Sequence, residues 1–265
     1  MLTMSHVFVF CSIGAIGGIF MGLIGTGIGP IAVPMLIILL PFVGVNKTIV
    51  APMAVATSLM AILLATIVSS ILHFKNNKID LNLFLSLLPG SLLGGVLGSG
   101  LIILIPTYLI SLVFCILLLF IGLKMCLNIN KKITSSLPNH KKIFLYSAGI
   151  GCVCNMLGVS DGILMVPFLN RYNIPIQIAI GTATALVIPV SLIGLIVLVI
   201  EGIASSYLPA YSLGYIYFPA LFFIGLTGCL FAVVGIILSK NISEQILRKI
   251  FGFIMIGLSI KMIFL

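Results

Sequence analysis

Two glycine-rich segments have the residue types best suited to holding a ligand. Residues 25–30 read GTGIGP, and residues 158–162 read GVSDG. Glycine permits positive φ and a close approach of the backbone, and Pro30 suits the first turn of a helix because its missing N–H is no loss there. A helix N-terminus offers unpaired N–H donors and a partial positive charge. We therefore predict that each segment starts a helix whose N-terminus favours a small anion.

Hydroxyl residues follow each segment, near the starts of the next expected helices: Thr57, Ser58, Thr182 and Thr184. Their side chains can donate hydrogen bonds to the same anion. Alternatively, each hydroxyl bonds back to a carbonyl of its own helix or across to a neighbouring helix, as is common in membrane helices. Both interpretations stay open at this point.

The composition indicates that these helices lie in a membrane. Of 265 residues, 62% are hydrophobic and 6% are charged, whereas a soluble domain has about a quarter charged residues. The chain is therefore expected to be an integral membrane protein. Its 13 Lys and Arg outnumber 4 Asp and Glu, and they occupy short gaps between apolar runs, which is typical of the positive-inside rule rather than of a nucleic-acid-binding face. The expected partners are the lipid bilayer and a small anion, not nucleic acid, and a homo-oligomer is left open.

Asp161 stands at an interruption of an apolar run. An isolated charge at the bilayer centre costs about 2.5 to 3.5 kcal/mol on insertion scales, so we expect its carboxyl to be protonated or paired with a cation. Ser160 and Asp161 also stand where N-cap residues belong. Asp161 is thus a candidate for coupling anion movement to a proton gradient, with simple N-capping as the alternative.

Residues of metal sites and catalytic centres are sparse. His6, His73 and His140 are not spaced as a metal-binding pair, and no two of the 6 cysteines are spaced Cys-x-x-Cys. No motif of an ATP-binding loop occurs. We therefore expect no metal, no cofactor and no enzymatic activity.

The apolar runs predict an all-α polytopic membrane protein. The length accommodates seven or eight segments of about 20 apolar residues. Residues 31–43 and 163–169, which follow the glycine-rich segments, are too short to cross a core about 30 Å thick. The two halves also align in register, at the pairs Gly25/Gly158, Gly29/Gly162, Pro34/Pro167 and Leu36/Leu169.

This alignment predicts an internally duplicated bundle with a broken helix at the start of each half. Residues 1–127 form the first repeat, 128–142 a central polar loop and 143–265 the second repeat. If the broken element crosses the membrane, the halves are parallel. Lys47, Arg171 and Lys240 then lie on the opposite side of the membrane from the other cations considered. If it re-enters, only Lys47 opposes them. The charge bias favours re-entry and an inverted repeat, with the central loop cytoplasmic in either case.

The residues after each interruption resemble a known family. Residues 33–36 read VPML and residues 166–169 read VPFL, and an Ala-x-x-Thr stretch follows each, at 54–57 and 179–182. This pattern resembles the TauE/SafE family of sulfite-exporter-like permeases over nearly the whole chain. The resemblance implies duplicated four-helix units that move sulfite, sulfonates or related small organic acids across the cytoplasmic membrane. Ile28 and the pair Ser160 and Asp161 stand where the family usually has glycine, which leaves the substrate open.

We therefore expect a multi-pass protein of the cytoplasmic membrane that acts as a secondary transporter of a small anion, with one half moving against the other. A passive anion channel is the alternative, and a membrane-embedded enzyme is disfavoured because only one acid lies at an interruption. The anion is expected between the two half-helix N-termini near the midplane. The candidate ligand-binding residues are Gly25, Thr26, Gly27, Gly29, Pro30, Thr57, Ser58, Gly158, Ser160, Asp161, Gly162, Thr182 and Thr184.

Overall fold

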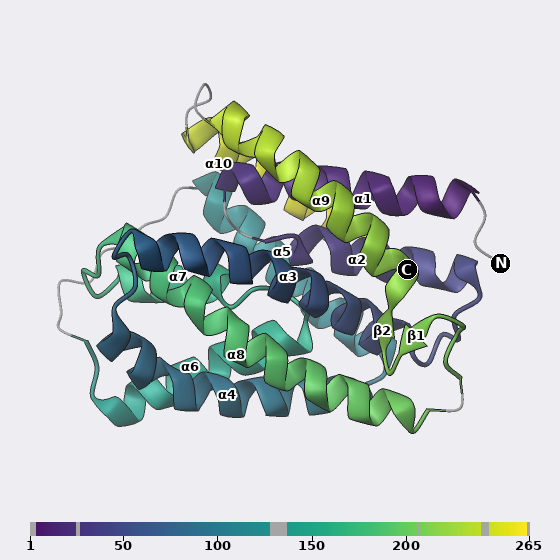
Figure 1. The fold of residues 1–265 in the computed structure, drawn as a ribbon, viewed down its shortest axis with the longest axis horizontal. Coiled ribbons are helices and arrows are strands. Elements are labelled where there is room, and N and C mark those ends of the chain that lie inside the picture. The colour runs from purple at the N-terminus through teal and green to yellow at the C-terminus, as the bar shows by residue number, and fades with distance from the viewer. Residues whose placement is uncertain (1–3, 25–26, 128–136, 206, 240–243, 264–265) are drawn as a thin grey trace.

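The structure is a computed structural model that describes residues 4–24, 27–127, 137–205, 207–239 and 244–263. Helices dominate it, as predicted, and one short antiparallel hairpin precedes the ninth α-helix (Figure 1). In chain order the elements are α1 (Met4–Ile24), α2 (Gly29–Leu39), the 3-10 helix η1 (Leu40–Val43), α3 (Val50–Lys75), α4 (Leu81–Leu104), α5 (Thr107–Leu127), α6 (His140–Met156), α7 (Gly162–Asn170), α8 (Ile176–Ile203), β1 (Ser212–Leu213), β2 (Ile216–Tyr217), α9 (Phe218–Ser239) and α10 (Glu244–Ile263).

Several described helices are suited to crossing a bilayer. Five are long and apolar enough: α3, α4, α5, α8 and the Phe218–Gly235 part of α9. The predicted total of seven or eight spans is not confirmed by this count. As predicted, α2 with 11 residues and α7 with 9 are too short to cross alone. The chain is therefore a mostly helical, multi-pass membrane protein.

The sequence sets the helix boundaries by simple local means. The Asp80 carboxylate accepts a hydrogen bond from the Leu83 backbone N–H at 3.1 Å and so caps the start of α4. Ile105, which precedes Pro106, is extended, and this ends α4 one residue earlier. Gly44 ends η1 with a φ of 90°. These turns reverse the chain between helices, but the main packing partners, such as α1 with α9 and α4 with α6, are distant in the sequence.

Glycines bring two helix pairs into close backbone contact. Side chains at Gly90, Gly94 and Gly98 of α4 would collide with backbone carbonyls of α6, and those at Gly14 and Gly18 of α1 with carbonyls of α9. Small residues permit such close approach of helices in membranes. In both pairs the residue numbers of the contacts rise together, so α4 runs parallel to α6 and α1 runs parallel to α9.

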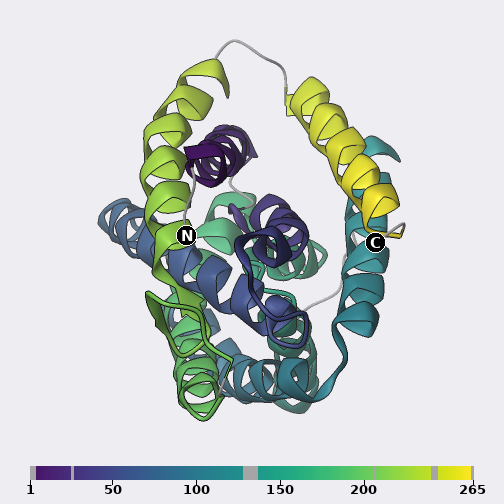
Figure 2. The ribbon, with the colours of Figure 1, turned by 90° about the vertical axis from the view of Figure 1, so that its right-hand side faces the viewer.

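The last helix of each predicted half forms a third pair, which runs antiparallel. Gly122 of α5 lies opposite Gly252 of α10, and the Ser259 hydroxyl donates to the Cys115 backbone carbonyl at 3.1 Å. Here the residue numbers run in opposite directions along the two helices. Figure 2 shows α5 and α10 together along one side of the molecule, with α2 and α3 in its interior.

The two interrupted elements enter from opposite ends of the molecule. Figure 1 shows that the start of α1 and the end of η1 lie at the end that carries the β hairpin. The start of α6 and the end of α7 lie at the other end, beside the end of α3. Each interruption is therefore the tip of a hairpin, α1–α2 or α6–α7, that reaches into the molecule and returns.

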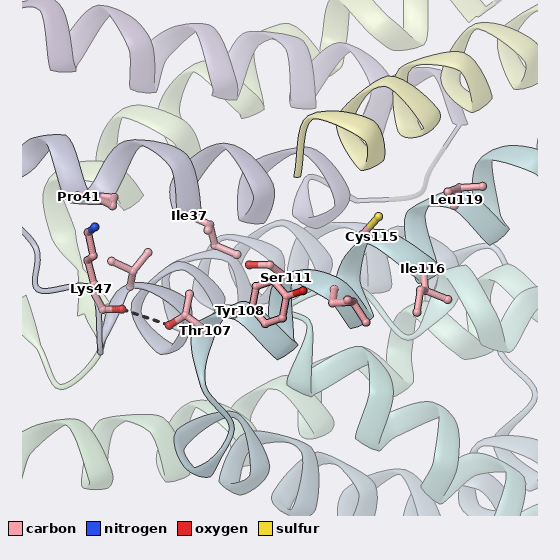
Figure 3. A pocket seen from close by; sticks show the side chains of 11 residues that line it. Ile37, Pro41, Lys47, Thr107, Tyr108, Ser111, Cys115, Ile116 and Leu119 are labelled. Atoms are coloured by element: carbon pink, nitrogen blue, oxygen red, sulfur yellow. Dashed lines mark hydrogen bonds between the residues drawn. The ribbon is translucent and has the colours of Figure 1, made fainter. Parts of the chain in front are cut away.

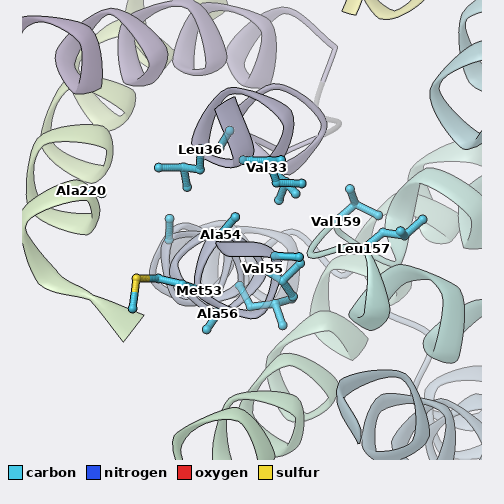
Figure 4. Close-up of a cluster of buried hydrophobic side chains, with 14 of the residues drawn as sticks. Val33, Leu36, Met53, Ala54, Val55, Ala56, Leu157, Val159 and Ala220 are labelled. Atoms are coloured by element: carbon cyan, nitrogen blue, oxygen red, sulfur yellow. The ribbon is translucent and has the colours of Figure 1, made fainter. Parts of the chain in front are cut away.

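The core surrounds the short helix α2. Val33 and Leu36 of α2 are buried, as are the residues from Met53 to Ala56 of α3. Leu157 and Val159, at the tip of the α6–α7 hairpin, extend this cluster (Figure 4). The two tips consequently lie at the most enclosed part of the protein.

Candidate functional site

The two hairpin tips have the backbone conformation that the sequence predicted. Gly27 has a φ of 79° and Gly158 a φ of 64°. Around Gly158, the Val159 N–H donates to the Cys154 carbonyl at 2.9 Å and the Gly158 N–H to the Asn155 carbonyl at 3.1 Å. This pair of bonds is a Schellman motif, which ends α6 and needs glycine at the left-handed position. The interruption is thus encoded locally by GVSDG.

Each tip leads directly into a half-helix. Pro30 lies in the first turn of α2, as predicted, and Ile28 is the N-cap. Asp161 is the N-cap of α7, but its side chain makes no capping hydrogen bond. Instead the Ser160 hydroxyl accepts from the Gly162 N–H at 3.4 Å, a long bond. The N-terminus of α7 is therefore only weakly satisfied by side chains.

The two tips are in contact with each other. A Cβ placed on Gly29 would lie 2.5 Å from the Gly158 carbonyl oxygen and 2.9 Å from Val159 Cα. A Cβ on Gly27 would lie 3.4 Å from Ser160 Cβ. The start of α2 and the turn before α7 therefore meet across the molecule, and glycine at 29 permits the contact because no side chain fits there.

Ser58 joins α3 to this junction. Its hydroxyl donates to the Gly158 carbonyl at 2.9 Å, and both residues are buried. This bond gives the second tip a partner from the first part of the chain. Ile28, with 3% of its surface exposed, and Val159, with 2%, close the space around it. The junction of the two tips is therefore closed in this conformation.

Asp161 is a polar residue at the junction that lacks a full set of hydrogen-bond partners in the described structure. It is 2% exposed. Within the described part of the chain, its Oδ2 atom has no hydrogen-bond partner. The buried Cys154 thiol lies beside the carboxyl. A buried carboxylate without a cation is costly, so this geometry suits a neutral carboxylic acid or a group that gains its partner during function.

The other hydroxyl residues do not converge on the tips. Thr57 donates to the Met53 carbonyl at 2.7 Å and accepts from the Tyr217 N–H at 3.1 Å, which anchors β2. Thr182 accepts from the Asp80 N–H at 3.0 Å, at the start of α4. β2 and the start of α4 lie toward opposite ends of the molecule in Figure 1. Thr184 is half-buried on α8, and Gly25 and Thr26 lie outside the described residues.

Comparison with known proteins identifies the family. The family model described as sulfite exporter TauE/SafE matches residues 10–262. The chain belongs to this family. It is 28% identical to a probable membrane transporter protein of Haemophilus influenzae, over 94% of this chain and 95% of the relative. It is 24% identical to a probable membrane transporter protein of Methanocaldococcus jannaschii, over 89% of this chain and 87% of that relative. No solved structure matches.

The TauE/SafE protein is therefore a membrane transporter and not an enzyme. Among the residues whose placement is described, no three His, Cys, Asp or Glu are grouped to hold a metal ion.

This TauE/SafE protein also buries polar atoms that the sequence analysis missed. Asn155 of α6 and Ser99 of α4 are buried, and the Asn155 Oδ1 and Ser99 Oγ atoms have no hydrogen-bond partner among the described residues. Both atoms face Gly194 of α8, where a side chain would collide with them. An asparagine within an apolar run was the available signal, and it lies three residues before the interruption at Gly158.

Proposed function

We propose that this TauE/SafE protein is a secondary transporter that binds a small anion where the tips of the α1–α2 and α6–α7 hairpins meet. The anion is sulfite, a sulfonate or a related organic acid. The observation that carries the proposal is the contact between Gly29 and Gly158, because it brings the N-terminus of α2 against the turn that starts α7. Two half-helix N-termini supply partial positive charge to an anion without a lysine.

We infer that the chain is a duplicated, inverted repeat of residues 1–127 and 143–265 joined by the loop 128–142. The helix pairs support it: α1 with α9 and α6 with α4 are equivalent pairs under exchange of the halves. The antiparallel pairing of α5 with α10 fits a two-fold axis in the membrane plane. Under this arrangement the α1–α2 and α6–α7 hairpins re-enter from opposite sides, and α3, α4, α5, α8, α9 and α10 cross.

The charges support an orientation in the cytoplasmic membrane with the loop 128–142 on the cytoplasmic side. The end of the molecule where α3 and α7 end and α6 begins carries most of the cations. Lys47 precedes α3 at the other end. The positive-inside rule assigns the first end to the cytoplasm. The cations at that end include Lys75, Lys78, Lys141, Lys142 and Arg171.

Access to the site requires the tips to separate. The first tip is joined to α9 through the glycine contacts of α1, and the second to α4 through those of α6. The moving bodies in our proposal are therefore these interleaved helix groups rather than the two halves of the sequence. The bond from Ser58 to the Gly158 carbonyl belongs to the closed state and breaks on opening.

Asp161 is the proposed coupling group. A proton on its carboxyl removes a buried negative charge next to the anion, so proton and anion bind together more favourably than either alone. The unpartnered Oδ2 atom supports this assignment. Release of the proton on one side would then favour release of the anion on the same side.

Reconstitution in proteoliposomes tests the proposal. Vesicles loaded with unlabelled sulfite should take up labelled sulfite by counterflow, with saturation and with competition by a sulfonate. Gly29→Ala should reduce this exchange roughly tenfold or more, because the added methyl overlaps the Gly158 carbonyl. Gly149→Ala in α6, where no atom lies within 4 Å, should leave it unchanged. Unsaturable anion currents would support a channel instead, and equal rates for both variants would contradict the proposed site.

A further inference from the structure

A cavity unrelated to the hairpin tips lies between α2 and α5 (Figure 3). Its volume is about 610 Å³, which is large for a small oxyanion. One wall is α5, and the other is the C-terminal part of α2 with the turns that lead into α3. The lining residues are Ile37, Pro41, Lys47, Val50, Thr107, Tyr108, Ser111, Leu112, Cys115, Ile116 and Leu119.

The cavity has one polar end and one apolar end. Lys47, Thr107 and Tyr108 line the end where α5 begins, and the Thr107 hydroxyl donates to the Lys47 backbone carbonyl at 3.2 Å. Leu112 and Leu119 line the part further along α5, which offers only apolar contacts beyond Cys115. The cavity is therefore amphipathic along its length, like a lipid.

The length of the cavity is close to the thickness of one leaflet of the bilayer. The lining residues of α5 extend from Thr107 to Leu119, which is about 18 Å at the rise of an α-helix. The hydrocarbon core of a bilayer is about 30 Å thick, so half of it is about 15 Å. Tyr108 is exposed at the start of α5, where amphipathic rings lie at the headgroup level. An acyl chain fits this depth, whereas a sulfite-sized anion leaves most of the space empty.

The positive-inside rule does not account for the positive charge of Lys47. The end of the molecule that carries it is poor in cations, as described above, and its side chain is exposed. The acids of the chain are Asp80, Asp161, Glu201 and Glu244, and none of them lines the cavity. The cation at the polar end is thus available to an anionic group from outside the protein.

We propose that this cavity is a binding site for one anionic phospholipid of the bilayer. Its phosphate lies at Lys47, at the end of the cavity where α5 begins, and an acyl chain lies along Leu112, Ile116 and Leu119. A lysine ammonium suits a phosphate, and the apolar wall suits the chain.

The site lies on the same helix as the first hairpin tip. Ile37 lines the cavity one turn after Val33, whose side chain packs against Gly158. A lipid in the cavity therefore contacts the helix that forms the tip. This inference stands on the cavity alone and holds whether or not the tips bind an anion.

Lipid retention by the purified full-length protein tests the site. After delipidation in mild detergent, the protein is titrated with phosphatidylglycerol or with phosphatidylcholine of the same chains, and bound lipid is counted by native mass spectrometry. We expect at least about fivefold preference for phosphatidylglycerol, from one charge-assisted contact. Lys47→Gln should remove the preference, whereas Lys78→Gln, in the turn after α3, should keep it.

A second pair of variants tests the apolar wall. Leu112→Trp fills the cavity and should abolish retention of both lipids, whereas Leu109→Trp, an exposed residue of α5 outside the lining, should not. Equal retention of both lipids by the unmodified protein, or unchanged retention by Leu112→Trp, overturns the proposal. Displacement of phosphatidylglycerol by millimolar hexanesulfonate also overturns it, because the cavity would then be a site for soluble anions.

Discussion

Ile28 and Asp161 occupy the same position in the two interruptions, directly before the first residue of α2 and of α7. Ile28 packs between α1 and α9: a Cβ on Gly17 would lie 3.0 Å from its Cγ2, and one on Gly228 would lie 2.7 Å from its Cδ1. Asp161 is equally buried but keeps a carboxyl oxygen without a partner in the described structure.

The equivalent N-cap positions therefore have two different uses. At the first tip the N-cap residue fills space and fixes the hairpin on its neighbours, so its contribution is packing energy. At the second tip the N-cap residue, Asp161, has an unfavourable free energy of burial, because its carboxyl is buried without a cation. Proteins keep such a cost at functional sites, so the comparison is consistent with a packing role for Ile28 and with the proposed coupling role of Asp161.

The largest effect should come from removing the titratable group while keeping its shape. Asp161→Asn should abolish proton-driven accumulation of the anion in proteoliposomes, because the amide cannot carry the proton. Counterflow without a proton gradient should persist, since the tips still meet. Both are measured with labelled sulfite at fixed external pH, with and without an imposed gradient. Full proton-coupled accumulation by Asp161→Asn would end the coupling role.

At the first tip the same logic predicts a loss of stability. Ile28→Ala removes the side chain that lies between Gly17 and Gly228, and this should destabilise the protein by about 2 to 5 kcal/mol. Unfolding in mixed micelles of increasing SDS content measures the change. Ile200→Ala removes an exposed side chain of α8 and serves as the control, with an expected change within about 0.5 kcal/mol. Similar values for the two variants would show that Ile28 does not act as packing.

Ser58 links α3 to the second tip, and its removal should have an intermediate effect. Ser58→Ala deletes the hydrogen bond to the Gly158 carbonyl, which is worth about 1 kcal/mol. If that bond holds the junction shut, the variant opens more readily, and the exchange rate for labelled anion should change about fivefold. Thr66→Ala is a matched control, because the Thr66 hydroxyl bonds to carbonyls of its own helix α3. An unchanged rate for Ser58→Ala would mean that the bond does not report on opening.

The local part of the site could be predicted from sequence, because its causes are local. Glycine at positive φ and a proline in the first turn are properties of single residues, and they led to the tips at Gly27 and Gly158 and to the short helices after them. The match between the interruptions also led to the expectation that the two tips meet. No long-range contact had to be known for these steps.

The partners of the helices could not be predicted in this way. The five candidate membrane-spanning helices are apolar over most of their surface, so periodicity does not say which face meets which neighbour. The pairing of α1 with α9 and of α4 with α6 depends on glycines that are common in membrane helices generally. The cavity beside Lys47 likewise forms between α2 and α5, which are far apart in the sequence.

The smallest effect on transport is expected at Thr57 and Thr182. The sequence suggested these hydroxyls as candidate ligands, but it could not predict their hydrogen-bond partners. Each hydroxyl accepts a backbone N–H from a distant segment, from Tyr217 or from Asp80, rather than facing the tips. Thr57→Val and Thr182→Val should therefore cost about 1 kcal/mol of stability each and change the anion KM by less than about twofold. Counterflow at varied anion concentration measures the KM. A tenfold rise in KM for either variant, with stability unchanged, would return that hydroxyl to the binding site and weaken the assignment of the anion to the hairpin tips alone.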